Sequence, residues 1–126
     1  MRFTFKKEER LTGHAALEHV YTKGKHVHTN SIKIIFVEVP QSEQPACRVV
    51  FSVPKRSFKK AVDRNLVKRR MREVYRHHKH LLYKHLAEKQ KHIHIYLIYT
   101  SRQIMPFDEL QENLVQALQI LLSRVN

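Results

Sequence analysis

Residues 61–76 read AVDRNLVKRRMREVYR and lay a dense run of cations over an apolar helical repeat. With about 100° of rotation per residue, one arc of such a helix can face a core. That arc carries Val67, Met71, Val74, His78, Leu81 and Leu82, with Tyr75 at its margin. A neighbouring stripe carries Lys68, Arg72, Arg76 and Lys79, and Arg69 widens it. The pattern predicts a helix from about Asp63, its N-cap, to about Glu88 that packs on its own protein and presents positive charge to a partner.

The positive charge of this segment has few internal partners. Eleven lysines and arginines lie between Lys55 and Lys79, against only Asp63 and Glu73. A merely solvated helix would more often interleave Glu with Lys four residues apart. The whole chain has a net charge of +13 and ten histidines. This surplus favours nucleic acid over an acidic protein or a membrane surface as the partner.

Length and composition predict one small folded unit. The chain has 126 residues, 42% of them hydrophobic, which suits a single domain over residues 1–126. No apolar run approaches the ~20 residues that span a bilayer. Residues 1–7, MRFTFKK, lack the apolar core of a secretory signal, so a cytoplasmic protein is expected. The lone Cys47 cannot form an internal disulfide and is interpreted as a small buried side chain.

The other helices are expected near the two ends of the chain. A short helix is predicted at 14–23, with Thr12 as N-cap and Gly24 as a left-handed residue that closes it. A last helix opens at Pro106, with Asp108 as N-cap. Its buried face is predicted to carry Leu110, Leu114, Val115, Leu118, Leu121, Leu122 and Val125.

Strands are expected between these helices. Runs rich in Ile, Val and Phe predict strands at 31–39 and 47–53, and a short extra strand is possible at 25–29. In the strand predicted at 93–99, alternate residues are apolar and face the core: Ile93, Ile95, Leu97 and Tyr99. The order of helix, strands, helix and strand indicates an α/β sandwich.

The sequence offers little catalytic machinery. Its two glycines cannot build a phosphate-cradling loop, and its eleven acidic residues are scattered. An autonomous nuclease is therefore disfavoured, and no catalytic residue is assigned. Histidines cluster at 77, 78 and 80 and at 92 and 94, but a structural zinc site usually includes thiolates and the chain has one cysteine. These imidazoles are interpreted as solvated or phosphate-facing, and no metal site is assigned.

Several motifs occur in the order of a known family. They are Phe5-Lys6 with Arg10-Leu11, a short helix with Leu17 and Tyr21 that ends at Gly24, Arg48-Val49-Val50-Phe51-Ser52-Val53 before Lys55-Arg56, Lys59-Lys60-Ala61-Val62-Asp63-Arg64-Asn65, and Val67-Lys68-Arg69 with Arg72-Glu73. They extend over essentially the whole chain. In these residues the chain resembles the protein subunit of bacterial ribonuclease P.

The resemblance implies a fold. It is an α+β two-layer sandwich of the αβββαβα type, in which helices cover a mixed four-stranded sheet, as in the ribosomal protein S5 domain 2-like fold. A left-handed βαβ crossover would pass through the basic helix, against the usual right-handed preference.

The resemblance also implies a function. The family's protein is a subunit of the ribonucleoprotein endoribonuclease that removes the 5′ leader from precursor tRNA. The catalytic RNA performs the cleavage with magnesium ions that it holds itself. The protein is then expected to bind no cofactor alone, to be inactive alone, and to be monomeric without RNA. Its partners would be ribonuclease P RNA and precursor tRNA, and neither DNA nor a membrane.

Position by position, the resemblance implies two sets of binding residues. Contacts to the catalytic RNA would come from Lys55, Arg56, Lys59, Lys60, Arg64, Asn65, Lys68, Arg69 and Arg72. Leu17 and Tyr21 would line the cleft for the single-stranded leader, although Leu17 stands where the family usually has an aromatic residue and cannot stack a base. Leu66 replaces the second arginine of the family's Arg-Asn-Arg motif, and Arg69 with Arg70 could supply that charge.

Two alternatives stay open at this point. A ribosomal or other structural RNA-binding protein could use the same basic helix without a role in cleavage. A sequence-specific DNA-binding protein is less well supported, because no helix-turn-helix partner, zinc ligand set or heptad zipper accompanies the basic helix.

Overall fold

The computed structural model describes residues 5–125. Its elements are η1 (Lys7–Glu9), α1 (His14–Lys23), β1 (Lys25–His28), β2 (Ile32–Val39), β3 (Cys47–Ser52), α2 (Ala61–Lys89), β4 (His92–Tyr99) and α3 (Phe107–Arg124). Residues 1–4, part of the segment for which no secretory signal is expected, lie outside the described residues. No helix within 5–125 is both long enough and apolar enough to span a membrane.

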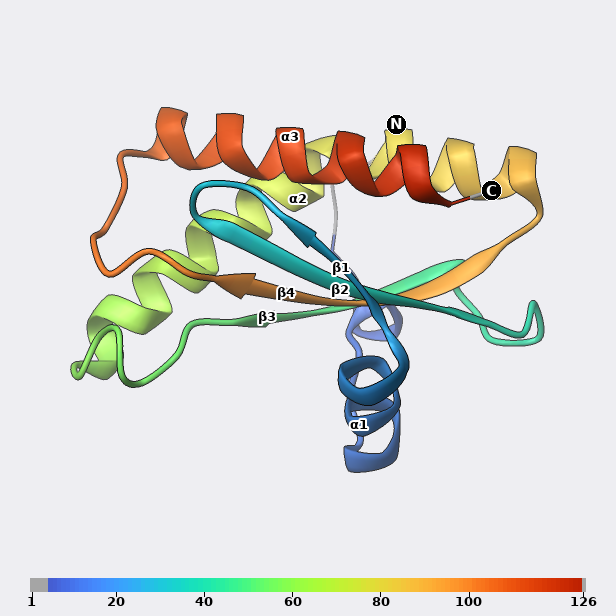
Figure 1. The fold of residues 1–126 in the computed structure, drawn as a ribbon, viewed down its shortest axis with the longest axis horizontal. Helices are drawn as coiled ribbons and strands as arrows, with labels where there is room; N and C mark the ends of the chain where they lie inside the picture. Colours follow the sequence, from blue (N-terminus) through green and yellow to red (C-terminus); the bar gives the residue numbers. More distant parts are fainter. Residues whose placement is uncertain (1–4, 126) are drawn as a thin grey trace.

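The four strands form one mixed sheet in the order β1-β2-β4-β3 (Figure 1). Strand β2 runs antiparallel to β1 and β4, whereas β3 runs parallel to β4. The parallel pair is joined through the long helix α2, as the resemblance implies. The predicted α+β fold class with a mixed four-stranded sheet is therefore confirmed, and the left-handed sense of the crossover stays a prediction.

The helices lie in two layers against this sheet. Helices α2 and α3 cover one face, and α1 crosses the other (Figure 1). Because side chains alternate along a strand, Ile34, Ile95 and Leu97 enter the core beneath α2 and α3. Ile35 faces the other way and packs with Leu11 and Val20 under α1. Other apolar side chains that pack against this second cluster, such as Val50, Tyr96 and Ile98, are only partly buried.

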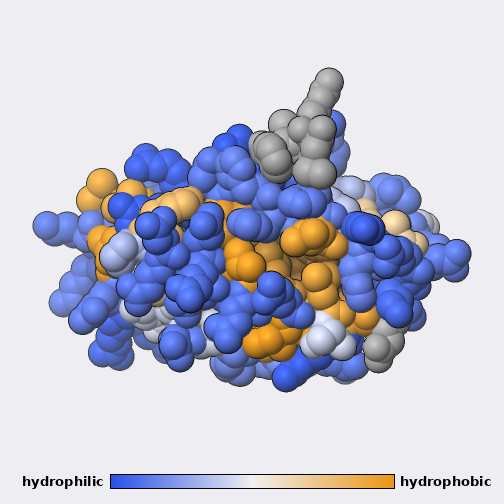
Figure 2. Space-filling view, turned by 90° about the horizontal axis from the view of Figure 1, so that it is seen from above, coloured by the Kyte–Doolittle hydropathy of each residue, from blue (hydrophilic) through white to orange (hydrophobic). Residues whose placement is uncertain are grey.

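The outer surface of the α2 and α3 layer is mostly hydrophilic, with hydrophobic side chains exposed near its centre (Figure 2). A narrow apolar groove runs between the two helices there, and Leu81 is 48% exposed beside it. The prediction that Leu81 faces the core is therefore wrong. Tyr75, predicted at the margin of the apolar arc, is fully buried instead.

Both long helices begin before the aspartates that were predicted as their N-caps. Helix α2 starts at Ala61 after Lys60, and α3 starts at Phe107 after Pro106. Asp63 and Asp108 thus lie within first turns and are not N-caps. A carboxylate in the first turn still interacts favourably with the helix dipole, which explains the acidic residue without a capping role.

The ends of α1 also differ from the predictions. Gly13, with φ of 93°, takes the N-cap position in place of Thr12. Gly24 has an ordinary φ of −75° and is not left-handed. A side chain at Gly24 would run into Ile35 and the carbonyl of Val20, so this glycine lets α1 approach the sheet closely.

Candidate nucleic-acid interface

A set of solvent-facing polar side chains covers the start of α2 and the loop before it. Seven of them are exposed and two are half-buried; we call the nine together the basic face: Lys55, Arg56, Lys59, Lys60, Arg64, Asn65, Lys68, Arg69 and Arg72. The structure thus brings together all nine residues that the resemblance assigns to the catalytic RNA. Within residues 5–125, none of them forms a salt bridge. The face keeps its charge available for phosphate groups.

Two arginines at this end of α2 hold the surrounding loops. The Nη1 atom of Arg64 donates to the carbonyl oxygens of Phe58 and Lys59, at 2.7 and 2.9 Å. Arg70 Nη1 donates to the carbonyl oxygen of Met105 at 2.9 Å. Arg64 therefore shapes the loop that carries Lys59, and Arg70 ties α2 to the loop before α3.

The missing arginine at Leu66 has one well-placed neighbour. Leu66 is half-buried, Arg69 is exposed, and Arg70 is half-buried and bonded to the protein. Of the two arginines expected to supply the charge that is absent at Leu66, Arg69 is therefore the better candidate.

The cationic stripe is shorter than predicted. Lys79 is buried, and its Nζ atom lies 2.7 Å from each carboxylate oxygen of Glu9, so its predicted exposure to a partner is wrong. Arg76 donates to both oxygens of Glu73, and this bonding lowers the pKa of the Glu73 carboxyl. Unpaired positive charge is thus concentrated on the N-terminal half of α2.

A second site lies on the open face of the sheet, beside the end of α1. A groove of about 490 Å³, which we call the aromatic groove, is lined by Tyr21, Lys33, Ser52, Pro54, Arg56, Ser57, Tyr96, Ile98, Tyr99, Thr100 and Arg102. Tyr21 is 61% exposed and meets the Tyr96 ring edge-on, with centroids 6.2 Å apart. Exposed aromatic rings with nearby cations suit an unpaired nucleotide strand.

The two residues assigned to the leader cleft have different surroundings. Tyr21 lines the aromatic groove, whereas Leu17 is half-buried and packs with the apolar cluster under α1. The sequence reasoning missed Tyr96, Lys33 and Arg102. The alternation of side chains along β4 could have indicated Tyr96, because it places this residue on the face opposite the core. Arg56 belongs to both the groove and the basic face, so the two sites adjoin.

Burial shifts the pKa of two side chains near the sheet, Cys47 and His94. Cys47 is buried, as predicted, and burial raises the pKa of its thiol to about 12, so it is no nucleophile at neutral pH. His94 is 6% exposed, and burial lowers the pKa of its imidazole. Among residues 5–125, no three His, Cys, Asp or Glu side chains are grouped so as to hold a metal ion.

A strongly basic two-layer α+β protein, with exposed cations on the first half of its long helix and an aromatic groove on the open face of its sheet, belongs to the class of small RNA-binding proteins. Within that class, the family model Ribonuclease P matches residues 5–122. The chain belongs to the ribonuclease P protein family.

Individual relatives agree with this assignment. The ribonuclease P protein component of Porphyromonas gingivalis is 29% identical over 116 residues, which cover 92% of this chain and 85% of the relative. The structure of the Staphylococcus aureus RNase P protein superposes with a TM-score of 0.73 at 25% identity, over 93% of this chain and 96% of that one. The RNase P protein of Thermotoga maritima, 22% identical, shares the fold with a TM-score of 0.67, over 94% and 98% of the two chains.

Proposed function

We propose that this protein is the subunit of a ribonucleoprotein endoribonuclease that removes the 5′ leader from precursor tRNA. In this proposal the whole chain acts as one cytoplasmic domain, and a ribonuclease P RNA performs the cleavage with magnesium ions held by the RNA. The observation that carries the proposal is the adjacency of two different sites, the basic face and the aromatic groove, which share Arg56. One site suits a structured RNA and the other a single strand.

The basic face would bind the catalytic RNA. Its cations are unpaired within the described residues, and they follow the family motif from Lys55 to Arg72. Arginine suits this role because its planar guanidinium can bridge phosphate oxygens or stack on a base. Each phosphate neutralised releases counterions, so affinity should fall steeply with salt.

The aromatic groove would bind the leader. Tyr21 and Tyr96 offer ring surfaces on which a base can stack without sequence preference. Lys33, Arg56 and Arg102 at its rim can neutralise the phosphates on either side of that base. The protein would thereby hold the substrate strand next to the RNA that cuts it.

Cleavage of a leader-bearing precursor tRNA at low magnesium tests the proposal. Three samples are assayed: a bacterial ribonuclease P RNA alone, this RNA together with the protein, and the protein alone. Activity that needs both components supports the proposed subunit role. Tight RNA binding without stimulation contradicts it and favours a structural RNA-binding protein.

A further inference from the structure

The segment before α1 is fixed in place by buried polar contacts. Glu9 in η1 bonds to Lys79 of α2 and accepts a hydrogen bond from the Tyr83 hydroxyl at 3.0 Å. Further along, the Leu11 amide donates to the carbonyl oxygen of Val49 at 3.0 Å, beside a parallel bridge between Arg10 and Val49. This segment therefore runs along the outer edge of β3 in a defined position.

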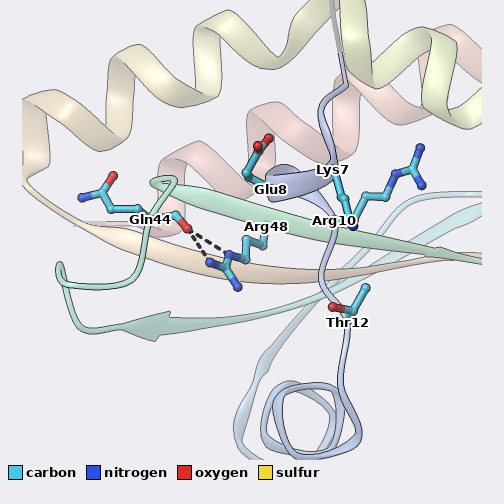
Figure 3. Close-up of a pocket in the computed structure, with 6 residues that line it drawn as sticks. All are labelled: Lys7, Glu8, Arg10, Thr12, Gln44 and Arg48. Atoms are coloured by element: carbon cyan, nitrogen blue, oxygen red, sulfur yellow. Dashed lines mark hydrogen bonds between the residues drawn. The ribbon is translucent and has the colours of Figure 1, made fainter.

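A groove opens between this segment and the start of β3 (Figure 3). It has a volume of about 390 Å³, and we call it the β3-edge groove. Its lining residues are Lys7, Glu8, Arg10, Thr12, Gln44 and Arg48. Three basic residues and one acid thus line a space outside both sites already described.

The two arginines of this groove contact other parts of the protein but are not neutralised by them. Arg48 donates from Nε to the carbonyl oxygen of Gln44 at 3.1 Å and also from Nη2 to the same oxygen, which leaves its other N–H groups available (Figure 3). The Arg10 guanidinium lies 5.8 Å from the centroid of the Phe5 ring. Within residues 5–125, neither arginine nor Lys7 forms a salt bridge, and the nearby acid Glu9 is already paired with Lys79.

We propose that the β3-edge groove binds the phosphodiester backbone of a single RNA strand. Lysine and arginine side chains on fixed backbone can follow a strand by its phosphates, with no need to read its bases. Thr12 places the groove at the start of α1, whereas Tyr21 lies near the end of the same helix. A strand that leaves the aromatic groove along α1 can therefore reach the cations; this path for the leader rests on the proposed function.

Charge removal tests the groove without any cleavage assay. One double variant combines Lys7→Gln with Arg10→Gln. The control double variant combines Lys84→Gln with Lys89→Gln, which removes the same total charge from two exposed lysines late in α2. Binding of fluorescent oligouridylate is measured over a range of salt concentrations. In a plot of the logarithm of the binding constant against the logarithm of the salt concentration, the slope should shrink by about 0.7 for each phosphate that the groove variant no longer neutralises. The slope should shrink by less in the control. Equal changes in the two double variants overturn the proposal.

A tethered cleavage reagent identifies which RNA supplies the strand. The variant Thr12→Cys offers an exposed thiol in the groove, while the natural Cys47 is buried. An iron–EDTA group attached there is assayed on the complex of the protein with precursor tRNA and ribonuclease P RNA. Localised cuts in the leader or in the catalytic RNA support the groove and name its ligand. A complex that forms but shows no localised cuts in either RNA overturns the proposal. Failure of the parent protein to stimulate precursor tRNA cleavage affects only the proposed function.

Discussion

Lys79 Nζ lies 2.7 Å from both carboxylate oxygens of Glu9, a residue seventy positions earlier in the chain. Both side chains are less than one-tenth exposed. The Tyr83 hydroxyl lies 3.0 Å from Glu9 Oε2 and 3.1 Å from the Cys47 carbonyl oxygen, so it links this ion pair to β3. The long helix, the first segment of the chain and the sheet are thus joined at one buried point.

Breaking this ion pair should destabilise the protein strongly. Lys79→Met leaves the Glu9 carboxylate buried without its cation, and we expect a loss of about 3 kcal/mol in the free energy of unfolding. Lys84→Met, an exposed change in the same helix, should cost less than about 0.5 kcal/mol. Urea unfolding measures both. Adding Glu9→Gln to Lys79→Met should recover part of the loss; no recovery would mean that the ion pair is not the cause.

The stability of the protein should fall at acidic pH in part because of His94. Burial lowers the pKa of this imidazole below its ordinary 6.5, and the nearby positive charges of Arg48 and His19 lower it further against the opposing effect of Glu43. Near pH 6.5 the imidazole of the unfolded chain takes up a proton while that of the folded chain does not. The contribution of neutral His94 to the free energy of unfolding is therefore present above pH 6.5 and is lost as the pH falls toward the lowered pKa.

The variant His94→Leu isolates this contribution. Its free energy of unfolding should decrease less than that of the parent protein when the pH is lowered from above to below 6.5. Gln116→Ala, an exposed change in α3 that removes no titratable group, should keep the parent's pH dependence. Identical pH profiles for the parent and His94→Leu would contradict the prediction.

Gly24→Ala should disturb the packing of α1 on the sheet. The added methyl group meets Ile35 and the Val20 carbonyl, and we expect a loss of about 1 to 3 kcal/mol in stability. Lys23→Ala, an exposed neighbour, serves as the control, with a change within about 0.5 kcal/mol. Thermal unfolding measures both, and equal melting temperatures of the two variants would show that the close approach tolerates a side chain.

The two α1 residues that the resemblance assigns to the leader should respond in opposite directions when they are changed. Tyr21→Ala removes a stacking surface and should weaken binding of leader-bearing precursor tRNA by about 1 to 3 kcal/mol. Leu17→Phe adds an aromatic ring and should strengthen it. Mature tRNA, which lacks the leader, is the control and should bind both variants like the parent protein. An unchanged affinity of Tyr21→Ala for the precursor would remove this tyrosine from the proposed site.

Arg72→Gln should weaken binding to ribonuclease P RNA in a salt-dependent way. With one phosphate fewer neutralised, the log–log salt slope should decrease by about 0.7 to 0.9. Lys84→Gln removes the same charge from a later turn of the helix and should leave the slope nearly unchanged. Filter binding at several salt concentrations gives both slopes, and equal slopes for the two variants would argue against a specific contact at Arg72.

Periodicity predicted each α-helix and the strands β2, β3 and β4, whereas β1 was only a possible strand. Alternation marked Ile93, Ile95, Leu97 and Tyr99 as core, and all four are buried. The nine residues of the basic face were assigned through the resemblance; among residues 5–125 they form no salt bridge, and their contact with RNA stays a prediction. The mixed sheet followed from the resemblance and could not come from pattern alone, since periodicity does not fix strand order.

Long-range pairing explains most of the errors. Lys79 was interpreted as exposed because helical projection cannot show that Glu9 packs against it. Tyr96 was not assigned to the groove because its place there depends on contact with Tyr21, which lies on another element. Gly24 was assigned a left-handed conformation from its place after a helix, whereas its role depends on Ile35 across the interface. In each case the deciding partner is distant in sequence.

Strand β1, at the end of the sheet opposite β3, also limits how copies of this protein can aggregate. An unpaired strand edge invites another chain to extend the sheet. Here that edge is only four residues long, carries Lys25, His26 and His28 on its exposed positions, and has the His26 carbonyl oxygen occupied by Arg124 at 2.7 Å. The positive charge of Lys25 repels the same edge of a second copy. Each copy therefore carries on its own edge the charge that disfavours strand exchange between molecules.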